Sequence, residues 1–146
     1  MFNKRLKQEL AALREELSSL VQVKESLESE MMVLTLEPDG RVQSVNQNFL
    51  DEMFYKSHDL IGRAIDDIVP AHVKSDEFHQ RFKSAMTRGE HFAGAVRLLR
   101  GNGDEAWLRS IVQPVRSSDG RIKHISIFSS DLTRTIEASR EHENLI

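Results

Sequence analysis

The sequence predicts an α+β fold: a five-stranded antiparallel sheet with short helices on one face, preceded by an N-terminal coiled-coil helix. A heptad repeat occupies the first 31 of 146 residues, and the β-prone runs beyond it are separated by turns rich in Gly and Asp. Two strands, several short helices and three further strands give the α+β order. We therefore assign residues 1–31 to a dimerisation helix, 32–133 to a globular domain and 134–146 to the start of another helix.

Apolar residues recur along the first segment at alternating steps of four and three. The a and d positions of the heptads, apart from Lys24, are Leu6, Leu10, Leu13, Leu17, Leu20, Leu27 and Met31. This stripe is two positions wide, whereas a helix that docks on its own domain usually shows three. We expect these residues to form a homodimer interface. The alternative is an amphipathic helix that folds back on the domain.

The globular segment contains two strands, then helices, then three strands. Turn sequences separate the strands, as in Pro38-Asp39-Gly40, Gly101-Asn102-Gly103-Asp104 and Ser117-Ser118-Asp119-Gly120. The predicted strands are residues 32–36, 41–45, 91–100, 105–115 and 121–130. Short helical segments are expected at residues 47–54, around 60–62 and at 64–69.

A longer helix is predicted between Ser75, a favourable N-cap, and Gly89, which ends it. Phe78, Phe82 and Met86 recur at steps of four. We expect this stripe to face the sheet. His79, one residue from Phe78, is then expected to face solvent.

Helices over one face of a curved sheet leave a cavity, and the alternation along the strands indicates which side chains line it. The candidates from helix and strands are Phe78, Phe82, Val96, Leu98, Leu108, Ser110, Val112, Ile125 and Ile127. The outer face then carries Trp107, Arg109, Ile111 and Phe128. We expect the N-terminal helix or a partner to pack against such an apolar row.

Composition excludes several classes of function. Twenty basic and 23 acidic residues, with a net charge of -3, give no positive field for nucleic acid. No apolar run approaches the roughly 18 residues of a membrane span, and the charged start is unlike a signal peptide, so we expect a cytoplasmic protein. There is no cysteine, and no two of the six histidines have metal-ligand spacing. No nucleophile elbow, phosphate loop or carboxylate pair indicates an enzyme.

Several short motifs occur in an order that resembles a known family. They are VNQNFL at 45–50, HDLIG at 58–62, a helix ending in RGE, GNGDEAWL at 101–108 and Asp131-Leu132-Thr133. The segment 32–133 resembles a PAS domain, most closely those of cytoplasmic bacterial chemoreceptors of the aerotaxis and biofilm-dispersion class. The resemblance implies the N-terminal part of a methyl-accepting chemotaxis-type receptor. Such a module dimerises and relays a ligand or redox signal to a C-terminal output domain, which this chain lacks.

The closing tripeptide is similar to the one that ends PAS domains and begins their output helix. Asp131 and Thr133 are therefore the candidate signal-relay residues. Their short side-chain oxygens can accept backbone N–H bonds and fix the exit angle. The alternative is that packing of Leu132 and Ile136 sets the direction of the helix.

Some PAS domains hold haem or flavin. In haem-binding relatives a histidine of the long helix holds the iron, and His79 is the histidine of that helix. Where the aerotaxis class holds flavin with an Arg-His-x-Asp run, this chain has Pro70-Ala71-His72-Val73. Asn46 and Trp107 occupy positions similar to those of the flavin class, so Asn46 joins the pocket candidates.

A photoadduct needs a cysteine, and the chain has none. We expect no bound cofactor. The alternatives are a haem- or FAD-bearing oxygen or redox sensor and a ligand-free interaction domain of a histidine kinase or diguanylate cyclase.

Overall fold

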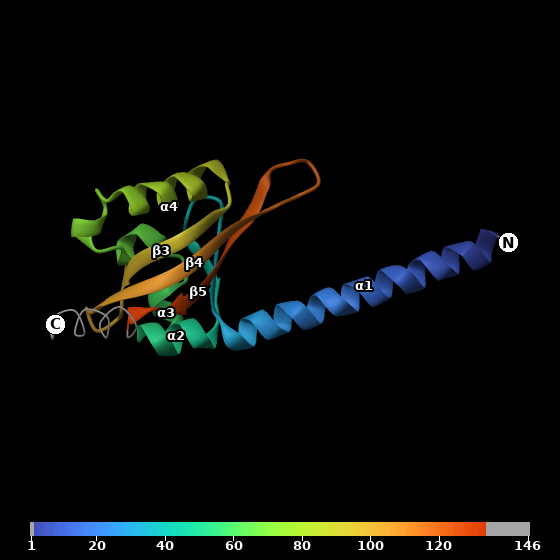
Figure 1. The fold of residues 1–146 in the computed structure, drawn as a ribbon, viewed down its shortest axis with the longest axis horizontal. Coiled ribbons are helices and arrows are strands. Elements are labelled where there is room, and N and C mark those ends of the chain that lie inside the picture. Colours follow the sequence, from blue (N-terminus) through green and yellow to red (C-terminus); the bar gives the residue numbers. More distant parts are fainter. Residues whose placement is uncertain (1, 134–146) are drawn as a thin grey trace, which may run out of the picture. The chain divides into compact units, whose positions relative to one another are not determined.

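The computed structural model describes residues 2–133 in two units, a long helix and a globular domain (Figure 1). The helix α1 (Phe2–Glu30) forms the first unit, and the second begins at Met31. The helix predicted at 134–146 lies outside the described residues.

α1 keeps its leucine stripe exposed. None of its side chains is buried, and the first five leucines of the stripe are 46% to 62% exposed. The ion pairs Arg5–Glu9 and Lys24–Glu28, each four residues apart, support the helix on its surface. Met31, predicted as the last interface position, lies one residue beyond the helix and is half-buried.

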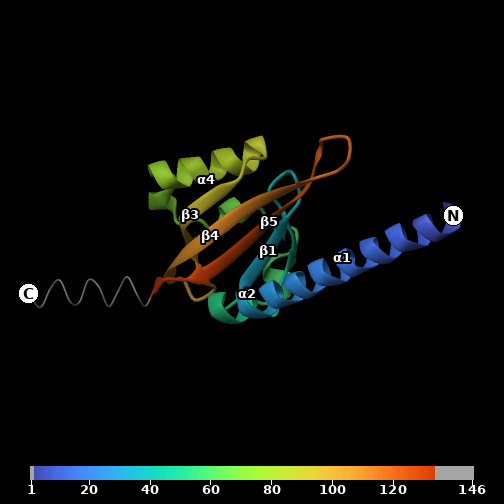
Figure 2. The ribbon, with the colours of Figure 1, turned by 45° about the vertical axis from the view of Figure 1, so that its right-hand side comes forward.

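The globular unit is built on the predicted five-stranded antiparallel sheet. Its order is β2 (Val42–Val45), β1 (Met32–Leu36), β5 (Ile122–Asp131), β4 (Glu105–Arg116) and β3 (Phe92–Leu99). All neighbours pair antiparallel. The first strand thus lies between the second and the last. Figure 2 shows β1 beside β5 from a second direction.

Five helical segments connect β2 to β3. They are α2 (Gln47–Met53), α3 (Ser57–Leu60), the 3₁₀ helices η1 (Ile65–Ile68) and η2 (Ala71–Val73), and α4 (Glu77–Arg88). α2 contacts β1 and α4 contacts β3, so the two helices lie toward opposite edges of the sheet (Figures 1 and 2).

The core lies between these helices and one face of the sheet. Side chains from alternate strand positions point into it, and all are at most 5% exposed: Val96, Leu98, Leu108, Val112, Ile125 and Ile127. Ser110 and Ser129 lie on the same face as a cross-strand pair, and their hydroxyls share a hydrogen bond of 2.8 Å. This bond satisfies two polar groups that would otherwise be buried without partners.

α4 begins one residue later than predicted, and a different set of its side chains is buried. Asp76, not Ser75, is its N-cap residue, and the buried side chains are His79, Phe82 and Ala85. Phe78 is 63% exposed, whereas His79 is 5% exposed. The prediction of an inward Phe78 that lines the interior cavity, and of a solvated His79, is therefore wrong.

The physical reason is that Phe78 and His79, four and three residues before Phe82, both lie close to its face of the helix. The imidazole of His79 contacts Phe82 at a ring-centroid distance of 6.3 Å and occupies the inward place. Its Nε2 lies 3.7 Å from Asp66 Oδ1, while Nδ1 has no hydrogen-bond partner among the described residues. Burial lowers the pKa of His79, and the neighbouring Asp66 only partly opposes this effect.

Acidification should destabilise the domain through His79. Because the folded state holds the pKa of His79 below the 6.5 of a solvated histidine, the unfolded chain binds the proton more readily. The free energy of unfolding should therefore fall as the pH drops below 6.5, which urea unfolding at about pH 7.5 and about pH 5.5 measures. His79→Gln should show a smaller fall than the unsubstituted chain.

The matched control is His91→Gln, because His91 is exposed. This variant should keep the full pH dependence. An identical fall in all three proteins would show that His79 contributes nothing to it.

Candidate functional site

The last strand ends in a turn that is fastened to β4. Thr133 N donates to Asp131 Oδ1 at 2.8 Å, and Trp107 N donates to Thr133 Oγ1 at 3.0 Å. Leu132 N donates to Trp107 O at 2.8 Å. Both candidate relay residues thus accept backbone N–H bonds, as their short side chains led us to expect.

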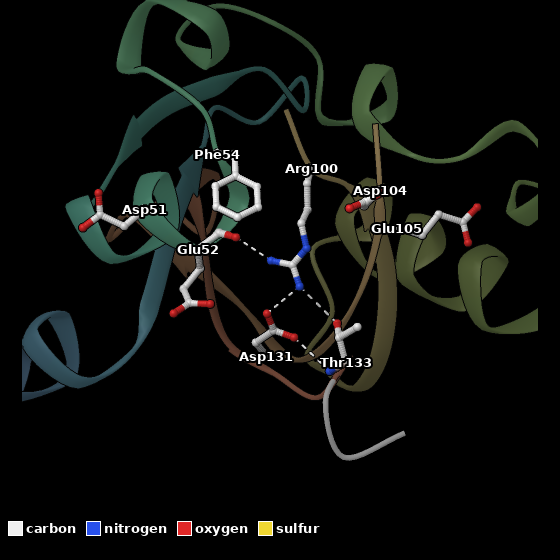
Figure 3. A pocket seen from close by; sticks show the side chains of 8 residues that line it. All are labelled: Asp51, Glu52, Phe54, Arg100, Asp104, Glu105, Asp131 and Thr133. Carbon is white, nitrogen blue, oxygen red and sulfur yellow. Dashed lines mark hydrogen bonds and ion pairs between the residues drawn. The ribbon is translucent and has the colours of Figure 1, made fainter. Parts of the chain in front are cut away.

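Arg100, the residue before the β3–β4 turn, joins this turn to the rest of the domain. Its guanidinium donates to Asp131 Oδ2 at 2.7 Å and to Thr133 Oγ1 at 3.2 Å. It also donates to Glu52 O, at the end of α2. Figure 3 shows Arg100 directed between these partners. We call Arg100, Asp131 and Thr133 the exit cluster.

The charges in the exit cluster are only slightly hydrated. The Arg100 side chain is 11% exposed. Burial alone would raise the pKa of Asp131, but hydrogen bonds from Thr133 and Arg100 outweigh it and hold the pKa below its ordinary value. Asp131 therefore stays ionised near neutral pH, and the charge-assisted bond to Arg100 is retained.

The C-terminal end of α2 lies directly against the β3–β4 turn. Gly101 N donates to Met53 O at 2.7 Å, and a Cβ at Gly101 would stand 1.9 Å from Phe54 O, so no larger residue fits without movement of the backbone. Phe54 has the left-handed φ of 58° that ends the helix. Its ring lies 5.9 Å from the Arg100 guanidinium. α2 and the turn are thus held as one structural piece.

The N-terminal end of α2 is fastened by Asn46 to the start of β1. Asn46 Oδ1 accepts from Phe49 N at 3.0 Å, which caps α2, and from Val33 N at 2.9 Å. Its Nδ2 donates to Met31 O at 2.8 Å. Asn46 therefore caps α2 and links it to β1. Its predicted place in an interior pocket is wrong, because both the oxygen and the nitrogen of its amide bind backbone atoms. Through α2, the first residues of the globular unit connect to the exit cluster.

A hollow of about 880 Å³ opens around Arg100. Its lining residues, shown in Figure 3, are Asp51, Glu52, Phe54, Arg100, Asp104, Glu105, Asp131 and Thr133. Five carboxylates surround one guanidinium, so the hollow is acidic. Arg100 is already bonded to Asp131, which makes the arrangement structural in character.

The other predicted pocket residues form packed core. Phe82 and the inward strand residues from Val96 to Ile127 named above contribute to the core, and Phe82 is 1% exposed. These side chains pack against one another between the helices and the sheet, and Val96 also lines a small hollow at the edge of the domain. Within residues 2–133, no cluster of three or more His, Asp or Glu could hold a metal, and no helix is both long and apolar enough to span a membrane.

Sequence reasoning missed Arg100. Its partners lie 31 to 48 residues away along the chain, where no local pattern connects them. The sequence signal that could have identified Arg100 is a basic residue directly before a tight turn, together with Asp131 at the end of the last strand, which needs a cation as partner.

A family model described as PAS domain matches residues 29–134. The chain is also 28% identical over 118 residues to the biofilm dispersion protein BdlA of Pseudomonas aeruginosa. That alignment covers 81% of this chain but 28% of BdlA, so the chain spans little more than a quarter of its relative.

Solved structures show the same fold at low identity. An RNA-binding light-oxygen-voltage receptor aligns with a TM-score of 0.69 at 20% identity, over 86% of this chain and 36% of that one. The light-state LOV domain of Aureochrome1 aligns with a TM-score of 0.66 at 17% identity, over 84% of this chain and 98% of that one. A PAS domain from Colwellia psychrerythraea aligns with a TM-score of 0.66 at 16% identity, over 79% of this chain and 98% of that one. With its order of strands and a family match over most of its length, the chain belongs to the PAS domain family.

Proposed function

We propose that this PAS domain is a dimeric cytoplasmic signalling module that passes a ligand or redox signal to an output domain through the exit cluster. The observation that carries the proposal is the bonding of Arg100 to both Asp131 and Thr133 and to the end of α2. The likeness to BdlA supports a place in a chemotaxis-type receptor. The module acts by binding, without catalysis.

The relay works by a shift between two arrangements of the exit cluster. A displacement of α2 moves Glu52 O and the β3–β4 turn together, because Gly101 N is bonded to Met53 O. Arg100, at the base of this turn, moves with them, and the strength of its bonds to Asp131 and Thr133 changes. A signal favours one arrangement only if it binds the two with different affinity.

Dimerisation through α1 provides the second half of the proposal. Each leucine of the exposed stripe that becomes buried contributes roughly 1.5 to 3 kcal/mol, and association costs roughly 4 to 15 kcal/mol. Six leucines on each chain are enough to offset this cost. The two-residue width of the stripe favours a coiled coil.

We further propose that the domain acts without haem or flavin. The residues that would surround such a group are core side chains in mutual contact, and flavin or haem would have to displace several of them. His79 lies beside Asp66 and Phe82, and Asn46 is committed to backbone atoms. The residues present do not fit either cofactor.

Arg100→Gln should change signalling more than folding. The amide cannot reproduce the charged bond to Asp131, so the turn at Thr133 loosens and the unstimulated swimming bias of cells producing the full receptor should change. The Thr133 amide resonance in NMR spectra of this chain should move as well. Arg109→Gln, at an exposed arginine of β4, is the control. An unaltered bias together with an unmoved Thr133 resonance would rule out the relay.

Leu17→Lys should dissociate the dimer, because it places a charge at an a position of the stripe. Light scattering at micromolar concentration measures the mass. Ser18→Lys, one residue away and off the stripe, should leave the mass unchanged. The proposal fails if a chain that begins at Met31 is still a dimer at the same micromolar concentration.

The purified protein should be colourless. Its absorbance spectrum after gel filtration should contain neither a Soret band nor flavin bands, because the interior is occupied by side chains. Either set of bands at near-stoichiometric amount would contradict the proposal that no cofactor is bound.

A further inference from the structure

A second, smaller hollow lies between the start of α4 and the edge strand β3. Its volume is about 180 Å³, below the roughly 300 to 1,000 Å³ of pockets for drug-sized ligands. The lining residues are Val73, Asp76, Phe78, His79, Ala95, Val96, Arg97 and Trp107. A ligand that fits here is therefore a small molecule.

One side of the hollow offers hydrogen-bond donors. The Arg97 guanidinium lies over the Trp107 ring, 3.9 Å from its centroid, and its side chain is 25% exposed. Glu105 Oε2 forms an ion pair with it at 4.0 Å, which is too long for a hydrogen bond. Among residues 2–133 no acceptor receives a hydrogen bond from this guanidinium. The planar guanidinium is suited to bind a carboxylate.

The other side offers acceptors. Asp76 is the N-cap residue of α4, yet its carboxylate makes no capping hydrogen bond. Beside it, His79 is buried and its Nδ1 has no partner in the described part of the chain. Nε2 lies 3.7 Å from the Asp66 carboxylate, so we assign the proton to Nε2, which leaves Nδ1 as an acceptor. A buried polar atom without a partner calls for a ligand or a water molecule.

Apolar surface completes the hollow. Val73 and Val96 are buried in its floor, and Phe78 is the large exposed side chain of α4 that the core does not use. A ligand thus meets a cation, an anion with a neutral acceptor, and a hydrophobic wall within one small space. Neither a simple carboxylic acid nor a simple amine satisfies all three.

We propose that this hollow binds a free α-amino acid with an apolar side chain. Its carboxylate accepts hydrogen bonds from Arg97, its ammonium donates to Asp76 and to His79 Nδ1, and its side chain packs against Val73 and Phe78. No covalent step is involved. The proposal concerns binding alone, so it stands or falls independently of the relay.

Calorimetric titration of the whole chain with L-leucine, L-valine and L-phenylalanine tests the proposal. At least one should bind at near-unit stoichiometry. For the tightest of them, the analogues without the ammonium or without the carboxylate should bind about tenfold more weakly or worse; for leucine these are 4-methylpentanoate and 3-methylbutylamine. The proposal is overturned if none of the amino acids binds at millimolar concentration, or if an analogue binds as tightly as its parent.

Two pairs of variants locate the site. Arg97→Gln should weaken binding about tenfold or more, whereas Arg109→Gln should not. Ala95→Leu should fill the hollow and prevent binding, whereas Ala93→Leu, two residues away on the same strand and outside the lining, should bind normally. Equal binding by Ala95→Leu and Ala93→Leu, or by the two arginine variants, would place the ligand elsewhere and reject this site. Thermal unfolding confirms that each variant is folded.

Discussion

The guanidinium of Arg100 is the point at which three separate parts of the domain meet: the end of α2, the base of the β3–β4 turn and the end of β5. Its acceptors are Glu52 O, Asp131 and Thr133. The side chains of Arg100 and Asp131 are only 11% and 20% exposed, so water and salt screen their charge-assisted bond less than they screen a fully exposed pair. Arg100 therefore links the three parts at the point where the chain leaves the sheet.

Local patterns predicted most of the fold. The heptads of α1 and the turn sequences around Gly40, Gly103 and Gly120 fixed where the elements begin and end, and all three glycines adopt positive φ. Alternation along β4 and β5 assigned the buried face, because the sheet is covered on one side by helices. These features depend on residues that are neighbours in the sequence, which explains why the sequence alone was sufficient.

The functional details depended on contacts that the sequence does not show. Phe78 and His79 stand four and three residues before Phe82, so periodicity could not choose between them, and the ring contact of His79 decided the outcome. Asn46 has the residue type of an N-cap, but its tie to Met31 O requires β1 to lie beside α2. Arg100 could not be identified from the sequence for the same reason, since its partners come together only in the folded domain.

Trp107 connects the small hollow to the exit cluster. Its ring stacks under Arg97 in the wall of the hollow, while its backbone N and O hold Thr133 Oγ1 and Leu132 N. Arg97 and Trp107 are direct cross-strand partners, so a group that draws Arg97 away from the ring acts on the same residue that fixes the exit. A ligand carboxylate would also compete with Glu105 for Arg97, and Glu105 lines the acidic hollow around Arg100. The proposed ligand site and the exit cluster thus share one strand, β4, through Trp107.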